Sequence, residues 1–332
     1  MKYNEILASI DNKKYQNIYF LAGDENYYID KISDYISNKV LADEEKSFNQ
    51  VILYGKETSA LEIISEAKQY PFGAEYRVVI VKEAQQIRNI DKLEAYCDNP
   101  LNSTVLVICY KKKIDKRKSF FKKIIKTNQL FESNKLYENQ VSGWINNYFT
   151  QKKLSITNES CEVLTQHLGT DLSKITNEIE KMLININDEK TITLDLIEKH
   201  IGISKDFNIF ELQNSLATKD IYNCNLIAKF LSANQKSNPF VLTISSVFSF
   251  FKKVLIFKQV QNQDRIKIAS TLKINPYFVS QYQTASRNYS LAQLNQIFEY
   301  INNYELRSKG IGNNNTSSKS LLEELIFKIL HC

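Results

Sequence analysis

The sequence predicts an α/β domain with a parallel sheet, followed by two all-helical domains. Short runs of β-branched and aromatic residues alternate with amphipathic stretches over residues 1–140 of the 332-residue chain. After residue 140 the strand-like runs stop and helical periodicity continues to the C-terminus. The chain has only 8 Gly and 4 Pro, a composition that favours helices over tight turns.

Five runs within residues 1–140 are typical of short strands. Two of them contain the segments VVIV and VLVI, which are apolar on both faces, as expected for buried strands of a parallel sheet. The five runs cover 17–22, 48–54, 77–82, 104–110 and 129–136. The amphipathic stretches that flank them, which we expect to be helices, cover 26–41, 58–69, 86–97 and 115–127. This architecture is common among nucleotide-binding proteins, but architecture alone does not establish a function.

Residues 141–208 predict a small helical domain, and residues 209–332 predict a second one. In the first, Thr157 or Asn158 is a favourable helix N-cap and Gly169 a favourable helix end. The helices expected in the second cover 209–217, 219–235, 238–262, 264–272, 276–288, 290–308 and 317–331. Its most apolar stretch is interrupted by Ser and Lys, so we expect a buried helix and no membrane span.

Charge and cysteine usage narrow the class of protein. The net charge is +2 over residues 1–140, −3 over 141–208 and +7 over 209–332, which makes the last part the better candidate for contact with a polyanion. The five cysteines are scattered without a metal-ligand spacing, so we expect reduced thiols and no metal site. The N-terminus lacks the apolar core of a signal peptide, and we expect a cytoplasmic protein.

The stretch GDENYYID, residues 23–30, stands where a nucleotide-binding protein has its phosphate loop. That loop requires the pattern G-x-x-x-x-G-K-[ST], in which the lysine and the hydroxyl contact the phosphates and Mg²⁺. With Gly23 as the first glycine, Tyr28, Ile29 and Asp30 occupy the positions of the second glycine, the lysine and the hydroxyl. None of the three can replace the required group, so the sequence predicts a degenerate loop with no nucleotide cofactor and no catalytic residues.

The segment QYPFGAEYR, residues 69–77, joins a predicted helix to a predicted strand. Pro71 ends the helix and Gly73 permits a sharp turn. Phe72 belongs to neither periodic pattern, which leaves two interpretations. It either lies exposed with Tyr70 and Pro71 and binds a partner's pocket, or it folds back into the core.

A basic run, KKKIDKRKSFFKKIIK, covers residues 111–126 and holds nine basic residues and one acid. The candidates for contact with a nucleic-acid backbone are Lys111, Lys112, Lys113, Lys116 and Arg117. The favoured alternative is a solvated helix face above a buried stripe. The residues of that stripe are Ile114, Phe121, Ile124 and Ile125.

Taken in order, these segments resemble the delta subunit family of the bacterial DNA polymerase III clamp loader. The similar stretches are YFLAGDENYYIDK, QYPFGAEYRVVIVKEA, TVLVICYKKKIDKRKSFFK, Trp144 in its helix, GTDLSKITNEIEKM and ELRSKGIG with LLEELIFKIL. The resemblance implies an AAA+-like clamp-binding domain over 1–140, a helical lid domain over 141–208 and a helical collar domain over 209–332.

The resemblance also implies a role and partners. Members of that family do not hydrolyse ATP; they bind the beta sliding clamp through a hydrophobic pair on a loop and open it. The pair falls here at Pro71 and Phe72, and because Pro71 replaces an aliphatic residue, Phe72 is the stronger candidate. The implied partners are the gamma/tau and delta-prime subunits of a hetero-pentamer, and primer–template DNA within the complex.

Two alternatives remain open. One is an AAA+ ATPase that binds nucleotide, and the other is a scaffold subunit similar to delta-prime. Relatives of delta-prime usually carry a zinc-binding cysteine cluster and a Ser-Arg-Cys motif, and the sequence contains neither.

Overall fold

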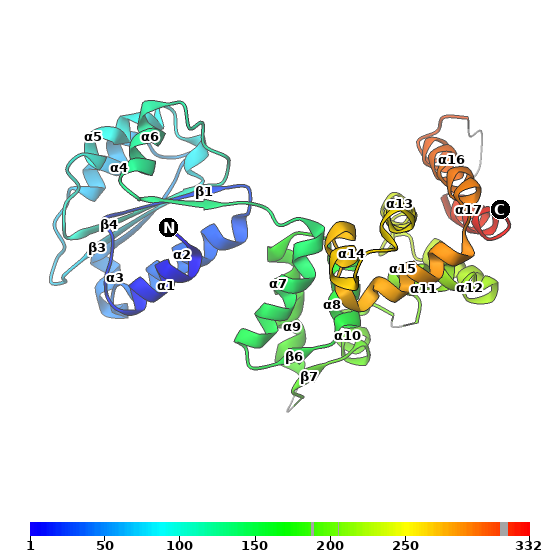
Figure 1. The fold of residues 1–332 in the computed structure, drawn as a ribbon. Coiled ribbons are helices and arrows are strands. Elements are labelled where there is room, and N and C mark those ends of the chain that lie inside the picture. The colour runs from blue at the N-terminus through cyan, green and yellow to red at the C-terminus, as the bar shows by residue number, and fades with distance from the viewer. Residues whose placement is uncertain (187–188, 205, 313–317) are drawn as a thin grey trace. The chain divides into compact units, whose positions relative to one another are not determined.

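A five-stranded parallel sheet lies at the centre of the first part of the chain. A computed structural model describes residues 1–186, 189–204, 206–312 and 318–332 (Figure 1). The strands are β1 (Ile18–Gly23), β2 (Gln50–Tyr54), β3 (Arg77–Lys82), β4 (Thr104–Tyr110) and β5 (Leu130–Ser133). Their order across the sheet is β2-β3-β4-β1-β5. The predicted parallel sheet is therefore confirmed.

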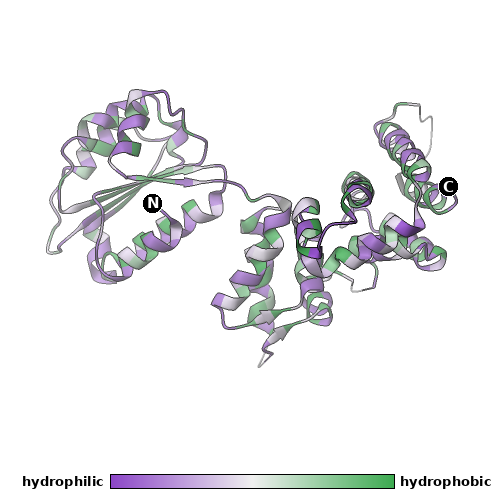
Figure 2. Cartoon of the chain, viewed as in Figure 1, coloured by the Kyte–Doolittle hydropathy of each residue, from purple (hydrophilic) through white to green (hydrophobic). Residues whose placement is uncertain are grey.

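Helices cover both faces of this sheet, which explains why the central strands are apolar throughout. Helices α1 (Tyr3–Asp11) and α2 (Asn26–Lys39) pack on one face, while α4 (Ala60–Ala67), α5 (Glu94–Cys97) and α6 (Ser119–Lys126) pack on the other (Figure 1). Along β1, Tyr19 and Leu21 belong to the first core, whereas Phe20 contacts the rings of Phe120 and Phe121 in the second. In Figure 2 hydrophobic residues follow the central strands, and the helices carry both kinds of residue.

Three local expectations for this region were wrong. The run 48–54 is not all strand, because α3 (Asp43–Asn49) extends into it. The stretch 86–97 is no single helix: Asn89 adopts a left-handed conformation with φ 55°, and short 3-10 turns at Ala84–Gln86 and Ile90–Leu93 precede α5. In α6 the buried face includes Phe120, whereas Ile125 is exposed.

The second part of the chain is largely helical. It begins with α7 (Glu138–Gln151), α8 (Asn158–Leu168), α9 (Leu172–Asn185) and α10 (Leu194–Ile201). It continues with α11 (Ile209–Thr218), α12 (Ile221–Ala233), α13 (Phe240–Val260), α14 (Arg265–Leu272), a 3-10 turn (Pro276–Phe278), α15 (Val279–Asn288), α16 (Leu291–Ser308) and α17 (Ser318–Leu330). Thr157 caps α8 by accepting a hydrogen bond from the amide of Ser160 at 3.2 Å, and Gly169 ends that helix, as predicted.

The expectation that strands stop after residue 140 was also wrong. β6 (Ser155–Ile156) and β7 (Thr191–Ile192) form a small parallel pair between the helices. Each strand has two residues, which is too short for a periodic pattern to reveal.

The chain divides into two compact units, Met1–Leu136 and Tyr137–Cys332. The first boundary lies near the predicted one at residue 140. Within the second unit, α8 packs against α11, so the predicted division at residue 208 crosses a helix contact and stays a prediction.

Among the described residues, one helix, α13, is long and apolar enough to cross a membrane. Within the second unit it packs against α15 and α16, and its inner face buries large side chains such as Phe250, Phe251 and Val254. This packing accounts for the inner face of the helix, whereas Val241, Leu242 and Phe248 are exposed.

The cysteines are free, and four of them are buried in the cores. Burial raises the pKa of Cys97 to about 12 and that of Cys109 to about 11. Both therefore stay protonated at neutral pH and act as small apolar residues.

Candidate functional site

The strand order places a topological switch point at the carboxyl ends of β1 and β4. From β1 the chain continues into α2 on one face of the sheet, and from β4 it continues into α6 on the other. Open parallel sheets bind ligands at such a switch point. In this chain the two ends are joined directly, because the amide of Gly23 donates to the carbonyl of Lys112 at 3.1 Å.

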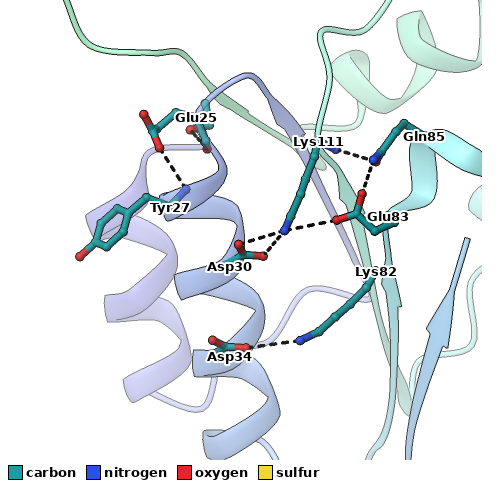
Figure 3. A network of polar contacts seen from close by, with 9 residues as sticks. Glu25, Tyr27, Asp30, Asp34, Lys82, Glu83, Gln85 and Lys111 are labelled. Carbon is teal, nitrogen blue, oxygen red and sulfur yellow. Dashed lines mark hydrogen bonds and ion pairs between the residues drawn. The ribbon is translucent and has the colours of Figure 1, made fainter. Parts of the chain in front are cut away.

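Several backbone amides at the end of β1 are already bonded within the chain. The amide of Asp24 donates to the carbonyl of Ser133 at 3.0 Å, and the Ser133 hydroxyl donates to the carbonyl of Glu25 at 2.8 Å. The buried carboxylate of Glu25 caps α2 by accepting from the amide of Tyr27 at 3.1 Å (Figure 3). An anion would normally bind at this helix N-terminus, and the carboxylate already occupies that place.

Gly23 owes its place to packing. Its φ is +137°, and a Cβ atom at this position would lie 1.8 Å from the carbonyl oxygen of Ser133. Only glycine allows β1 to approach the end of β5 so closely. The residue that looks like the first glycine of a phosphate loop is therefore required by the sheet itself.

The three residues that replace the rest of the phosphate loop also have structural roles. Ile29 is fully buried in the core beneath α2. The ring of Tyr28 packs edge-on against that of Tyr3, with 4.9 Å between the centroids. Asp30 forms an ion pair with Lys111 at 2.9 Å.

Lys111 lies at the centre of an ion-pair network near this switch point (Figure 3). Its ammonium group is 2.9 Å from Asp30 and 3.4 Å from Glu83, and its backbone amide donates to the side chain of Gln85 at 3.0 Å. Burial lowers the pKa of Lys111, but the hydrogen bond to Asp30 and the charges of Asp30 and Glu83 outweigh it and raise the pKa overall. The positive charge of Lys111 is thus paired with acidic side chains of the chain itself.

Nearby, Lys82 stands where a nucleotide-hydrolysing protein has a metal-binding aspartate. Its ammonium group lies 3.8 Å from Asp34 of α2 (Figure 3). Within the parts of the chain that the structure describes, no cluster of three or more His, Cys, Asp or Glu side chains is arranged to hold a metal ion.

Most of the basic residues proposed to face DNA have an acidic partner. The ion pairs are Lys111–Asp30, Lys113–Asp24, Lys116–Glu132 and Arg117–Asp115, with distances of 2.9, 3.2, 2.7 and 2.9 Å. Lys112 is exposed, and no ion pair of it is found among the described residues. These pairs reduce the free positive charge of the surface, and a role in DNA contact stays a prediction.

The loop of residues 68–76 connects α4 to β3 and carries exposed aromatic side chains. Phe72 is 75% exposed and Tyr70 is 77% exposed, while Pro71 is half-buried. Gly73 has a φ of +64°, which gives the turn its left-handed step. Of the two interpretations that the sequence left open, the structure therefore supports the exposed position of Phe72.

Two buried polar residues hold this loop in place, and the sequence pattern did not reveal either. The side chain of Asn49 accepts from the amide of Phe72 at 2.7 Å and donates to its carbonyl at 2.9 Å. The guanidinium of Arg77 donates to the carbonyls of Phe48 and Glu66, both at 3.1 Å. The only signal in the sequence was a polar residue near the start of each of the predicted strand runs 48–54 and 77–82.

Comparison with known proteins identifies the family. The family model described as DNA polymerase III, delta subunit matches residues 19–134, and the model of the C-terminal domain of the same subunit matches residues 206–329. The chain belongs to the DNA polymerase III delta subunit family. The resemblance noted in the sequence is thereby confirmed, and it favours delta over a delta-prime-like subunit.

Members of the delta family resemble the chain over most of its length. DNA polymerase III subunit delta of Bacillus subtilis is 27% identical over 318 residues, which are 92% of this chain and 91% of the relative. The probable delta subunit of Aquifex aeolicus is 22% identical over 218 residues, 62% of this chain and 61% of the relative. The solved structure of the Bacillus subtilis DNA clamp loader delta protein matches with a TM-score of 0.56 and 25% identity, covering 100% of both chains.

The delta family places the chain in the replicative polymerase assembly, as a subunit of the clamp loader type. At the switch point, polar side chains of the chain pair with one another. The loop of residues 68–76 presents exposed aromatic side chains.

Proposed function

We propose that this chain binds the beta sliding clamp through Phe72 and opens it for loading onto primed DNA, without hydrolysing ATP itself. The observation that carries the proposal is the exposed Phe72 on a loop fixed by the buried Asn49, in a chain of the delta family. Pro71 and Tyr70 flank Phe72 and complete the contact surface.

Burial of the exposed Phe72 ring would supply the binding energy. Transfer of a phenylalanine side chain from water into an apolar pocket contributes roughly 1.5–3 kcal/mol. Because the loop backbone is already held by hydrogen bonds, little conformational entropy is lost on binding. A ligand shifts the clamp between its closed and open states only by the difference between its affinities for the two states. The loop would therefore open the clamp by binding the open state more tightly.

The contacts at the switch point support the absence of intrinsic catalytic activity. The carboxylate of Glu25 already caps the N-terminus of α2, and Asp30 and Glu83 already pair with Lys111. In the proposed assembly the gamma/tau and delta-prime subunits complete a hetero-pentamer, which acts on primer–template DNA in the cytoplasm. ATP hydrolysis is the task of those other subunits.

Calorimetric titration of the full chain into the purified cognate clamp, without nucleotide, tests the proposal. Wild type should form a complex, and Phe72→Ala should weaken it by roughly 10- to 150-fold, the equivalent of the burial energy of one ring. Because the ring is exposed, the thermal stability of the variant should be unchanged. Equal clamp affinity of the two proteins would refute the assignment.

A further inference from the structure

Phe48 lies beside Phe72, although it comes from a different element. The two ring centroids are 5.8 Å apart, and the ring planes are inclined by 52°. Phe48 stands near the end of α3, before β2, and is 66% exposed. Exposed apolar side chains that gather on one surface mark interaction sites more often than single ones do.

Buried polar groups fix the backbone of both phenylalanines. Asn49, which directly follows Phe48, is 1% exposed, holds the amide and the carbonyl of Phe72, and donates to the carbonyl of Glu45 at 3.2 Å. Arg77, 6% exposed, holds the carbonyl of Phe48. A buried polar side chain is tolerated when its hydrogen bonds are made, and here those bonds connect α3 to the loop.

We propose that Phe48 is a second contact residue of the clamp-binding surface, and that Asn49 is a positioning residue that holds Phe48 and Phe72 as one rigid pair. This inference rests on the proposed function. It specifies the partner's surface further: the clamp must offer an apolar pocket wide enough for two adjacent aromatic rings. A pair ordered before contact loses less freedom on binding than two independent side chains.

The first test is a titration of the clamp with the full-length Phe48→Ala variant. We expect binding to weaken roughly 5- to 20-fold, less than for Phe72→Ala, because Phe48 is the less exposed ring. The matched control is Tyr222→Ala, which removes an aromatic ring that is 75% exposed on α12, and it should bind like wild type.

The outcomes separate this inference from the proposed function. If Phe72→Ala binds weakly while Phe48→Ala binds like wild type, the second contact is refuted and the proposed function stands. If both variants bind like wild type, the proposed function fails and this inference fails with it.

A double-mutant cycle tests the pairing of the rings. Since each ring supports the other, Phe48→Ala combined with Phe72→Ala should weaken binding by less than the product of the two single effects. If the two losses in affinity simply multiply, the rings are independent contacts, and the proposal that they act as a pair is overturned.

The role of Asn49 is tested in two backgrounds. In the wild-type background, Asn49→Ala should weaken clamp binding several-fold, and Asn49→Asp should not restore it, because the carboxylate keeps the acceptor for the amide of Phe72 but sets an oxygen against the carbonyls of Phe72 and Glu45. In the Phe72→Ala background, Asn49→Ala should weaken clamp binding much less, because the aromatic ring that Asn49 positions is absent. Equal losses in both backgrounds, accompanied by a lower unfolding temperature, would reveal a general structural role and overturn the positioning role.

Discussion

Gly23 illustrates how a single residue can be misread when a motif is taken alone. In the sequence it resembles the first glycine of a phosphate loop. In the structure its position is required because the carbonyl of Ser133 lies where a Cβ atom would be. The same residue type thus serves backbone packing where a nucleotide-binding protein uses it for phosphate.

Gly23→Ala should destabilise the first unit by roughly 3 kcal/mol, because the added methyl group collides with β5 and the backbone conformation is unfavourable. Urea unfolding followed by circular dichroism measures the change. Gly73→Ala is the matched control: it shares the positive φ but has open space around the position, and it should cost only about 1 kcal/mol. Equal losses of unfolding free energy for the two variants would contradict the predicted collision of the methyl group with β5.

The ion pairs of Lys111 should stabilise the fold by an amount that depends on pH. Lys111→Met leaves Asp30 and Glu83 without their cation and should lower the free energy of unfolding by about 1 kcal/mol at pH 7. The pKa of Lys111 is raised in the folded state, so its contribution is complete below the unfolded pKa of about 10.4 and is lost as the pH rises through the folded pKa.

The difference between wild type and Lys111→Met should therefore be constant near neutrality and shrink above about pH 10.5. Urea titrations at a series of pH values measure this difference in unfolding free energy, and pH effects of all other groups cancel because they are common to both proteins. Lys112→Met, at the exposed neighbouring position, should show no such gap. A gap that widened with rising pH would contradict the proposed ion pairing.

At the scale of elements, the carboxyl ends of β1 and β4 keep the topology of a ligand-binding switch point. The polar groups there are paired with one another, through the cap at Glu25 and the network around Lys111. Titration of the chain with ATP and Mg²⁺ should therefore show no saturable heat or fluorescence change at millimolar nucleotide. Saturable binding that Glu25→Ala strengthens would support a residual anion site, and tight binding by wild type would favour the alternative of an AAA+ ATPase.

The elements also show how far periodicity reaches. The bounds of β3 and β4 agree with the predicted runs 77–82 and 104–110, because both faces of these strands are buried and polar residues end the runs. The run 48–54 misled because an aromatic residue in a short helix resembles the start of a strand. The exposure of Phe72 stayed open since it depends on Asn49, 23 residues earlier in the chain, which no local pattern reports.

At the scale of the whole molecule, the order of a sheet-containing unit and a helical unit was predictable from the change in periodicity near residue 140. The ion pairs of the basic run were not, because the acids that pair with Lys113 and Lys116 come from other segments of the chain. Composition alone made this run appear more available to nucleic acid than the structure indicates.

In the proposed function, this chain opens the sliding clamp by binding energy alone. The direct measurement is the rate at which preloaded clamp leaves closed circular DNA when the chain is added without nucleotide. We predict that wild type accelerates release and that Phe72→Ala, at the same concentration, leaves the rate at its spontaneous value. Release that wild type does not accelerate, or that Phe72→Ala accelerates equally, would contradict the account.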